Sequence, residues 1–434
     1  MNISKFQIIT LVSFVIFIIA GVIAFAFYKG SAGTSTQLPS ITIWGTFPAT
    51  TLNQYVTDIN NNSQTPINVT YKQIDPSVFA SQFVAALARG IGPDAILITA
   101  DMLLPHVDKI ALIPYSALSA RTIADTYIQE AQIYTNSAGI LALPFTVDPL
   151  VMYWNRDMFN AAGIPTYPKY WDEFTSLNAK LTTKDQNGNI RKSAIAMGDF
   201  TNVDNAREIL GSLLLQIGNP ITAYNAQGLL QTTFNPTYQA NPTTVLQFFT
   251  QFVNPTNANY SWNRGQTDSK TAFLAGNLAT YFGFASELSG IRSKNPNLNF
   301  DVAQLPQVRS GGIKAVYARM YGLSIVRSTA NANGVYQVLS ILTDPTNLAK
   351  LAATMYLPPI RSDLIAQGSS DPYVSIFDQA ALVSKTWLDA DPVQSNQIFG
   401  SMIDSITSGQ SSIYQALGDG SSQYNVVLQQ ATGQ

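Results

Sequence analysis

The chain reads Gly139-Ile-Leu-Ala-Leu-Pro-Phe-Thr-Val-Asp-Pro-Leu-Val-Met-Tyr-Trp-Asn-Arg-Asp-Met-Phe159 in its most informative stretch. An apolar strand is expected to break at Pro144, to expose Asp148 and then to resume. Residues 90–101 repeat this design with a Gly-Pro turn, a short apolar strand and an acid, Asp101, at the end of the strand. Ligands of open α/β sheets lie beyond the carboxyl ends of strands, so Asp101 and Asp148 are candidate binding residues.

The segments around Asp101 alternate between strand and helix patterns. Strands are expected over 41–45, 67–73 and 95–98, with helices over 51–60 and 79–89. This alternation predicts an α/β fold with a parallel sheet and right-handed crossovers. Beyond residue 155 the pattern is mostly helical, with helices expected over 171–181, 204–217, 242–252, 269–275 and 333–343, the last closed by Asp344-Pro345, and strands over 279–284, 300–305 and 317–326.

The N-terminus predicts a membrane anchor. Residues 6–28 carry no charge, and a helix that rises ~1.5 Å per residue would span a ~30 Å hydrocarbon layer over that length. A cleavable signal peptide usually has a shorter apolar run of ~7–15 residues and a small-x-small cleavage site, whereas this run ends in Phe25, Phe27 and Tyr28. We therefore expect residues 1–30 to form an uncleaved anchor, residues 31–40 a flexible spacer, and the weakly charged remainder to fold outside the cytoplasm.

The composition excludes several classes of site. With no cysteine, the chain has no disulfide, thiolate metal site or lipid-modified cysteine. Its single histidine, His106, cannot build a His-rich metal site and is expected at the surface or at a helix cap. A net charge of −2 without any basic run argues against nucleic-acid binding. No metal and no cofactor are expected.

The order of motifs resembles a known family over residues 40–415. The segments are Gly92-Pro-Asp94 leading to Asp101, Leu143 to Asp157 with Trp171-Asp-Glu-Phe174, Ala272 to Gly283, Leu305-Pro306 with Tyr321 to Ile325, and Tyr356-Leu-Pro-Pro-Ile-Arg-Ser362. Each motif alone is loose, but five in this order resemble the extracellular solute-binding proteins of ABC importers, in the sugar-binding group that includes maltose-binding protein.

The resemblance implies a two-lobed, type II periplasmic-binding-protein-like α/β fold, with a ligand gripped between the lobes. It implies three hinge crossings, near 146–150, 302–307 and 343–348. The first lobe then comprises 41–147 with 306–345, and the second, helix-rich lobe comprises 148–305 with 346–434. Asp101 and Asp148 match positions whose carboxylates bind sugar hydroxyls in this family, and Trp44 and Thr46 match its first cleft loop. Phe284 stands just before Ala285, where the family's stacking Trp would be expected.

Several candidates have two interpretations. Asp101 contacts the ligand, caps the following helix, or does both. Trp44 either lines the cleft or packs in the core, and Trp262, in a polar run, is either a cleft wall or an anchor on a lobe surface. The remaining candidates lie on one strand, where Tyr317 and Tyr321 either face the cleft or pack in the core and Arg319 could donate to ligand oxygens.

These observations predict a membrane-anchored, monomeric binding protein and not an enzyme. Carboxylates and flat rings together suit a carbohydrate-type ligand, a mono- or oligosaccharide, which is captured in the inter-lobe cleft and delivered to ABC permease subunits. One alternative is a tethered ligand-sensing or adhesion module without transport. The other is a glycoside-active enzyme, since two acids across a cleft are also what a glycoside hydrolase uses.

Overall fold

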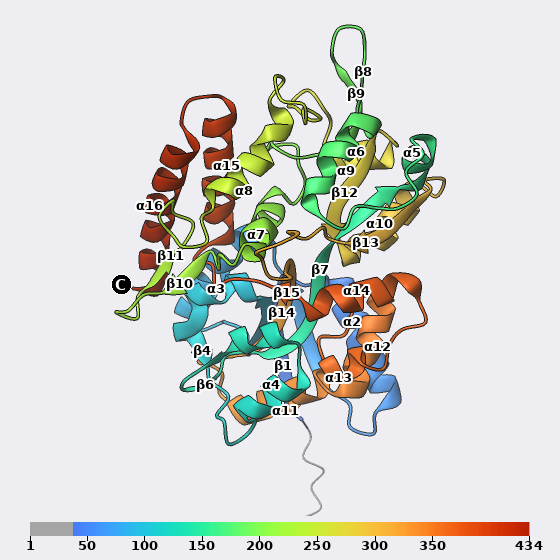
Figure 1. Cartoon of the computed structure of the whole chain (residues 1–434). Coiled ribbons are helices and arrows are strands. Elements are labelled where there is room, and N and C mark those ends of the chain that lie inside the picture. Colours follow the sequence, from blue (N-terminus) through green and yellow to red (C-terminus); the bar gives the residue numbers. More distant parts are fainter. Residues whose placement is uncertain (1–37, 434) are drawn as a thin grey trace, which may run out of the picture.

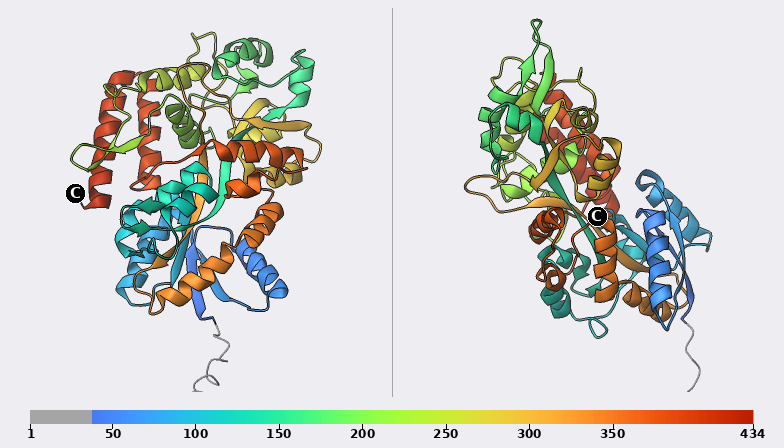
Figure 2. Two further views of the ribbon diagram at one scale, coloured as in Figure 1. Left: turned by 60° about the horizontal axis from the view of Figure 1, so that its bottom comes forward. Right: turned by 90° about the vertical axis from the view of Figure 1, so that its right-hand side faces the viewer.

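The computed structural model describes residues 38–433. Two lobes lie one above the other, with strand β7 (Leu143–Asn155) running between them (Figure 1), and the turned views keep the same division (Figure 2). The expected anchor and most of the spacer lie outside the described residues. Within residues 38–433, no helix combines the length and the apolar character that crossing a membrane requires.

The first lobe begins with the predicted alternation of strands and helices. Strands β2, β1 and β3 lie side by side and are parallel, as predicted, but β14 (Val316–Val326) and β7 continue the same sheet in antiparallel orientation. The sheet is therefore mixed. The elements of this lobe are β1 (Ser40–Gly45), α2 (Ala49–Asn62), β2 (Asn68–Gln73), α3 (Pro76–Ala88), β3 (Ala95–Thr99), η1 (Ala100–Met102), η2 (Leu104–Lys109), β4 (Ile110–Ala111), α4 (Ala120–Thr126), η3 (Gln129–Tyr134), β5 (Thr135–Asn136), β6 (Gly139–Ile140), α11 (Ala332–Leu342), α12 (Pro345–Met355) and α13 (Ser362–Ile365).

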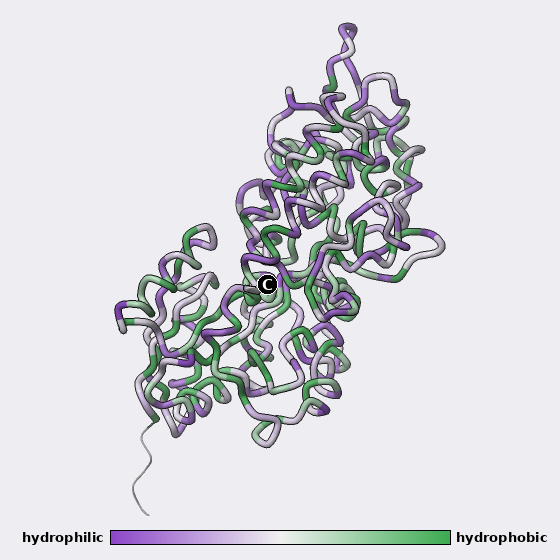
Figure 3. Tube along the Cα trace, turned by 90° about the vertical axis from the view of Figure 1, so that its left-hand side faces the viewer, coloured by the Kyte–Doolittle hydropathy of each residue, from purple (hydrophilic) through white to green (hydrophobic). Residues whose placement is uncertain are grey.

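The second lobe is rich in helices, as predicted, and extends the sheet beyond β7 through β12, β9 and β8. The β8–β9 hairpin projects at the top and is hydrophilic (Figure 3). Its elements are α5 (Arg156–Ala161), η4 (Trp171–Glu173), α6 (Phe174–Leu181), β8 (Thr183–Lys184), β9 (Ile190–Ile195), α7 (Ala206–Gln216), β10 (Thr222–Tyr224), β11 (Leu230–Thr232), α8 (Thr243–Thr250), η5 (Gln251–Val253), α9 (Ser269–Leu274), β12 (Leu278–Phe284), η6 (Ala285–Glu287), α10 (Leu288–Lys294), β13 (Phe300–Gln304), α14 (Pro372–Leu382), β15 (Ser384–Lys385), α15 (Pro392–Thr407) and α16 (Ile413–Thr432).

Strand β7 (Leu143–Asn155) runs without a break, so the predicted interruption at Pro144 is wrong. Proline lacks an N–H donor and is tolerated where a sheet ladder is irregular. That condition holds here, because the register between β7 and β14 (Val316–Val326) shifts between Tyr321 and Gly322, opposite Pro144. Asp148 is also buried at 5% exposure instead of exposed.

Asp-Pro pairs start several of the helices. Helices α12, α14 and α15 each begin with a proline at the first position, preceded by an aspartate whose side chain accepts hydrogen bonds from backbone N–H groups of the first turn. Asp344-Pro345, which the sequence suggests as the end of α11, is therefore mainly the start of α12.

Two separate clusters of buried apolar residues fill the lobes. Along the chain, packing changes from the first cluster to the second between Val147 and Leu150 and returns between Tyr317 and Ala318. Between α12 and α14 the two clusters share the chain, because Leu357 and Phe377 pack in the second cluster whereas Ile365 and Ala381 pack in the first. The first change lies within the segment 146–150, where the resemblance implies a hinge crossing. No change of cluster occurs near 302–307 or 343–348, because β13 packs within the second cluster and α12 within the first. The hinge crossings expected there stay a prediction. Which residues move together on closure stays a prediction.

Candidate inter-lobe binding site

Asp148 lies at the first passage between the lobes, opposite Arg319 in the register of β7 and β14. Its Oδ1 accepts from the backbone N–H of Ser286 at 2.9 Å, and its Oδ2 accepts from the Ser286 hydroxyl at 2.6 Å. Burial raises the pKa of Asp148 to about 6, although Arg319 and the two Ser286 bonds oppose that rise. Asp148 therefore joins the base of the first lobe to the end of β12 in the second.

The end of β12 is shaped to present Ser286. A Cβ on Gly283 would lie 2.5 Å from the ring of Tyr281, so only glycine fits there. Past this glycine, the Glu287 carboxylate accepts from the backbone N–H of Phe284 at 2.9 Å and fixes the turn. The tight turn leaves Ser286 exposed and directed at Asp148.

Arg319 is half-buried, and its guanidinium lies 3.6 Å from the centre of the Phe284 ring. Burial alone would lower its pKa, but the carboxylates of Glu208 and Asp148 raise it. An arginine carries five N–H donors. Within residues 38–433, none of those of Arg319 makes a hydrogen bond or an ion pair, so a charged donor fork remains available at the lobe junction.

Asp101 sits on η1, directly after β3, and is 6% exposed. Its Oδ2 accepts from the Tyr317 hydroxyl at 3.0 Å and from Arg207 of the second lobe at 3.4 Å. Among the described residues its side chain accepts from no helix N–H, so the capping interpretation is not supported. Its Oδ1 has no hydrogen-bond partner in that part of the chain.

Arg207 reaches Asp101 from α7, and other residues of the second lobe hold its guanidinium in place. Its guanidinium donates to Asp389 at 2.5 Å and to the hydroxyl of Ser395 at 3.0 Å, and it stacks on Trp387 at 4.6 Å. Burial would lower the pKa of Arg207, but Asp389 and its other anionic neighbours raise it well above its usual value. Arg207 is therefore a fixed cation that ties the first lobe to the C-terminal helices.

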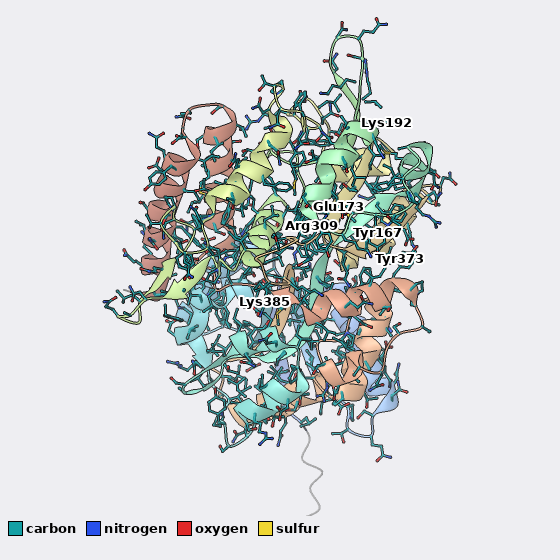
Figure 4. The ribbon with its side chains drawn as sticks, in the orientation of Figure 1. Tyr167, Glu173, Lys192, Arg309, Tyr373 and Lys385 are labelled. Atoms are coloured by element: carbon teal, nitrogen blue, oxygen red, sulfur yellow. The ribbon has the colours of Figure 1, made fainter. Side chains whose placement is uncertain are left out.

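A second ion pair joins the lobes at another place. Lys385, labelled near the junction in Figure 4, donates to Glu130 of η3 at 2.9 Å. Because β15 pairs with the start of β14, this ion pair lies beside the second passage of the chain. Polar contacts between the lobes therefore flank the crossing strands.

A cavity of about 1050 Å³ adjoins Asp148 through Ser286. Helices α2 and α12 of the first lobe line one side, and Ser286 and Ser289 of the second lobe line the other. Pockets for small ligands are commonly concave spaces of a few hundred to about 1,000 Å³ between rigid elements. The cavity and the Asp148–Arg319 pair together form the candidate site.

Five of the predicted site residues come together at the junction: Asp101, Asp148, Phe284, Tyr317 and Arg319. Phe284 and Tyr317 are fully buried. The Phe284 ring packs against the Arg319 guanidinium, and the Tyr317 hydroxyl donates to Asp101. Tyr321 is half-buried two residues along the strand from Arg319 and stacks edge-on to Phe47 at 5.1 Å.

The other three candidates lie differently. Trp262 is completely buried in the second cluster and donates to Asn202 at 2.8 Å, so it is neither a cleft wall nor a surface anchor. Its polar neighbours suggested exposure, but its indole N–H is satisfied inside the core. Trp44 is half-buried, packs against the first cluster and carries Lys72 over its ring at 4.2 Å. Thr46 is buried, and its hydroxyl has no partner among residues 38–433.

The sequence interpretation missed Arg207, Glu208 and Ser286. A signal for the first two exists, because an Arg-Glu pair opens the otherwise apolar helix Ala206–Gln216, where charges need partners. No comparable signal marks Ser286.

The prediction for His106, at the surface or at a helix cap, is wrong. Its side chain is 2% exposed and packs against Phe83, with 5.2 Å between the ring centres. Burial lowers the pKa of His106 to about 4. Within residues 38–433 no group of three potential metal ligands occurs.

Comparisons with known proteins agree with this architecture. The model of the family described as bacterial extracellular solute-binding protein matches residues 48–349. The fold is similar to a cyclic α-maltosyl-1,6-maltose binding protein from Arthrobacter globiformis, with a TM-score of 0.72, 16% identity, and coverage of 90% of this chain and 99% of that chain. It is also similar to a cyclo/maltodextrin-binding protein complexed with maltotetraose, with a TM-score of 0.70, 14% identity, and coverage of 90% and 97%.

A third solved structure, an ABC substrate-binding protein from Listeria monocytogenes in complex with cycloalternan, has a TM-score of 0.69 and 15% identity, with coverage of 91% of this chain and 99% of that chain. No curated protein matches the sequence. At these identities the solved structures establish the fold, and the family match rests on the sequence itself.

Proposed function

Because this chain belongs to the bacterial extracellular solute-binding protein family, we propose that it captures a carbohydrate-type ligand between its lobes and delivers it to an ABC importer. The members of this family are binding proteins, so no chemical conversion of the ligand is expected. Two structural neighbours are complexes with maltotetraose and with cycloalternan, which supports the carbohydrate class.

The unpaired guanidinium of Arg319 is the observation that carries the proposal. Water can occupy the donors of this half-buried arginine in the ligand-free protein, and a ligand that replaces the water gains charge-assisted hydrogen bonds. Arg319 is flanked by Asp148, so donors and acceptors lie together, as a sugar hydroxyl requires because it does both. Asp101, with one free carboxylate oxygen, adds a further acceptor near the junction.

The energetics suffice for a micromolar ligand. A hydrogen bond to a charged group contributes roughly 1.5–3 kcal/mol, and a micromolar dissociation constant corresponds to about −8 kcal/mol. Bonds to Arg319, Asp148 and Asp101 therefore approach that value, and apolar contact with a sugar face supplies the rest.

The ligand would work by shifting the population of open and closed lobes. A ligand that contacts both lobes favours the closed state by its difference in affinity for the two states. The polar contacts that cross the junction, from Ser286 to Asp148 and from Arg207 to Asp101, would guide the same closure. An importer then recognises the closed shape.

In this proposal the protein is a monomer held at the outer face of the cell membrane. Residues 6–28 would anchor it, and the spacer would let the body reach the permease subunits. Trp44 and Thr46 remain proposed members of the first cleft loop, which continues into Pro48 at the wall of the cavity.

The test is a carbohydrate screen by calorimetry on the full chain in a detergent without a sugar headgroup. The probes are linear α-1,4-gluco- and β-1,4-manno-oligosaccharides, cyclic glucans and polyols. We expect saturable binding of at least one oligosaccharide, with the recovered ligand chemically unchanged. Binding of none of them would refute a carbohydrate function, and recovery of shortened products would point to an enzyme.

A further inference from the structure

Tyr356 follows α12 in a conformation that a tyrosine rarely adopts. Its φ of 54° and ψ of 39° lie in the left-handed region, and its backbone N–H closes the helix by donating to carbonyls of the last turn. Glycine is the usual residue at such a helix end, because a side chain is strained there. The ring is nevertheless large and 49% exposed.

Tyr356 is one of the residues that line the cavity between α2, α12 and the second lobe. Helices α2 and α12 lie side by side in the first lobe (Figure 1) and contact each other. Ser286 and Ser289 close the cavity from the other lobe, and Ser286 also donates to Asp148. A ligand bound at Asp148 and Arg319 can therefore extend over Ser286 and reach the Tyr356 ring.

The polar groups around this ring include hydrogen-bond donors and acceptors, and most of them have bonding capacity left within the described residues. Gln54 and Asp58 of α2 bond to each other at 2.8 Å, which leaves the second carboxylate oxygen of Asp58 free within the described chain. Across the cavity, the Lys350 ammonium and the Ser289 hydroxyl make no hydrogen bond in residues 38–433. Donors, acceptors and an exposed flat ring are the combination that binds the rim and the face of a pyranose.

We propose that this cavity is an extension subsite for an oligosaccharide and that Tyr356 is its stacking platform. The proposal rests on the carbohydrate function and narrows it to ligands of several sugar units. The volume of about 1050 Å³ supports this, because it equals the upper end of the usual range for ligand pockets even without the space around Arg319. Strained backbone kept under an exposed side chain is typical of a functional position.

The experiment measures affinity as a function of ligand length. The full chain, in a detergent without a sugar headgroup, is titrated by calorimetry with linear α-1,4-gluco-oligosaccharides and β-1,4-manno-oligosaccharides of two to six units. We expect Tyr356→Gly to weaken binding of the longest ligands about three- to tenfold, and to leave the shortest ligand that binds unaffected. Tyr356→Phe keeps the ring and should bind like the parent.

Stability supplies a second readout of opposite sign. Because glycine removes the backbone strain, Tyr356→Gly should raise the melting temperature by roughly 1–3 °C while it weakens binding of long ligands. The matched control is Tyr414→Ala, which removes a tyrosine that is 62% exposed at the start of α16 and does not line the cavity. It should leave affinity for every ligand length unchanged.

The outcomes separate the subsite from the function. If oligosaccharides bind and Tyr356→Gly changes no affinity, or weakens all lengths equally, the subsite is refuted and the carbohydrate function stands. If no oligosaccharide binds the parent protein, both fail. A loss confined to long ligands, retained in Tyr356→Phe, supports the subsite.

Discussion

Replacing Asp148 by asparagine should stabilise the protein at neutral pH and weaken ligand binding. Asparagine has nearly the same shape, keeps an oxygen for the Ser286 N–H and can donate to the Ser286 hydroxyl, so the junction stays intact. What disappears is a buried charge. Burial raises the pKa of Asp148 from 3.8 to about 6, so the folded state holds its proton more tightly than the unfolded state.

The sign and size of the stability change follow from this rise in the pKa of Asp148. The stabilising effect of the protonated acid is complete below pH 3.8 and is lost as the pH rises to about 6. Across that range the loss approaches roughly 3 kcal/mol of the free energy of unfolding, to order of magnitude. The variant should therefore match the parent near pH 3.5 and exceed its melting temperature by several degrees at pH 7.5.

Binding should respond in the opposite direction. If the Asp148 carboxylate accepts from a sugar hydroxyl, its loss removes a charge-assisted bond and lowers affinity tenfold or more. The parent should also bind more weakly as the pH falls below about 6, whereas the variant should show no such dependence. Calorimetry between pH 4.5 and 7.5 and thermal unfolding measure both quantities. Unchanged affinity, or a variant less stable than the parent at pH 7.5, would refute the reasoning.

Three other perturbations give sharp expectations. Arg319→Met should lower ligand affinity roughly 10- to 100-fold in calorimetry, because the donors of Arg319 are otherwise unused, and Arg319→Lys should keep only part of the parent's affinity. Equal affinity of the parent and both variants would remove Arg319 from the site. Arg207→Ala should cost about 3–5 kcal/mol in urea denaturation, because it leaves Asp389, which is 0% exposed, without a counterion, and a loss below about 1 kcal/mol would contradict this. Removing residues 1–30 should yield a monodisperse soluble body in size-exclusion chromatography with light scattering, whereas persistent aggregation would show that the apolar segment packs into the fold.

Local patterns predicted much of the fold because they depend on neighbours in sequence. The alternation in β1 and β2 and the apolar run of β3 follow from which faces are buried, and Asp101 lies where its strand ends, as expected. The same reasoning failed for β7. Whether Pro144 breaks the strand depends on its hydrogen-bond pairing with β14, which lies far along the chain.

The site was only half predictable for the same reason. Asp148 and Arg319 could be named as candidates, but their partners are set by tertiary packing. Ser286 reaches Asp148 from 138 residues away, and Arg207 reaches Asp101 from 106. Trp262 was misjudged because its polar sequence neighbours hid a buried hydrogen bond to Asn202.

The central claim is that the two lobes close on a carbohydrate, and a distance between them tests it most directly. Because the chain has no cysteine, Asn53→Cys on α2 and Ser293→Cys on α10 place two spin labels at exposed positions, one on each lobe. With a saturating oligosaccharide that calorimetry shows to bind, the distance distribution between the labels should shift to shorter values and become narrower. An identical distribution with and without that ligand would contradict closure.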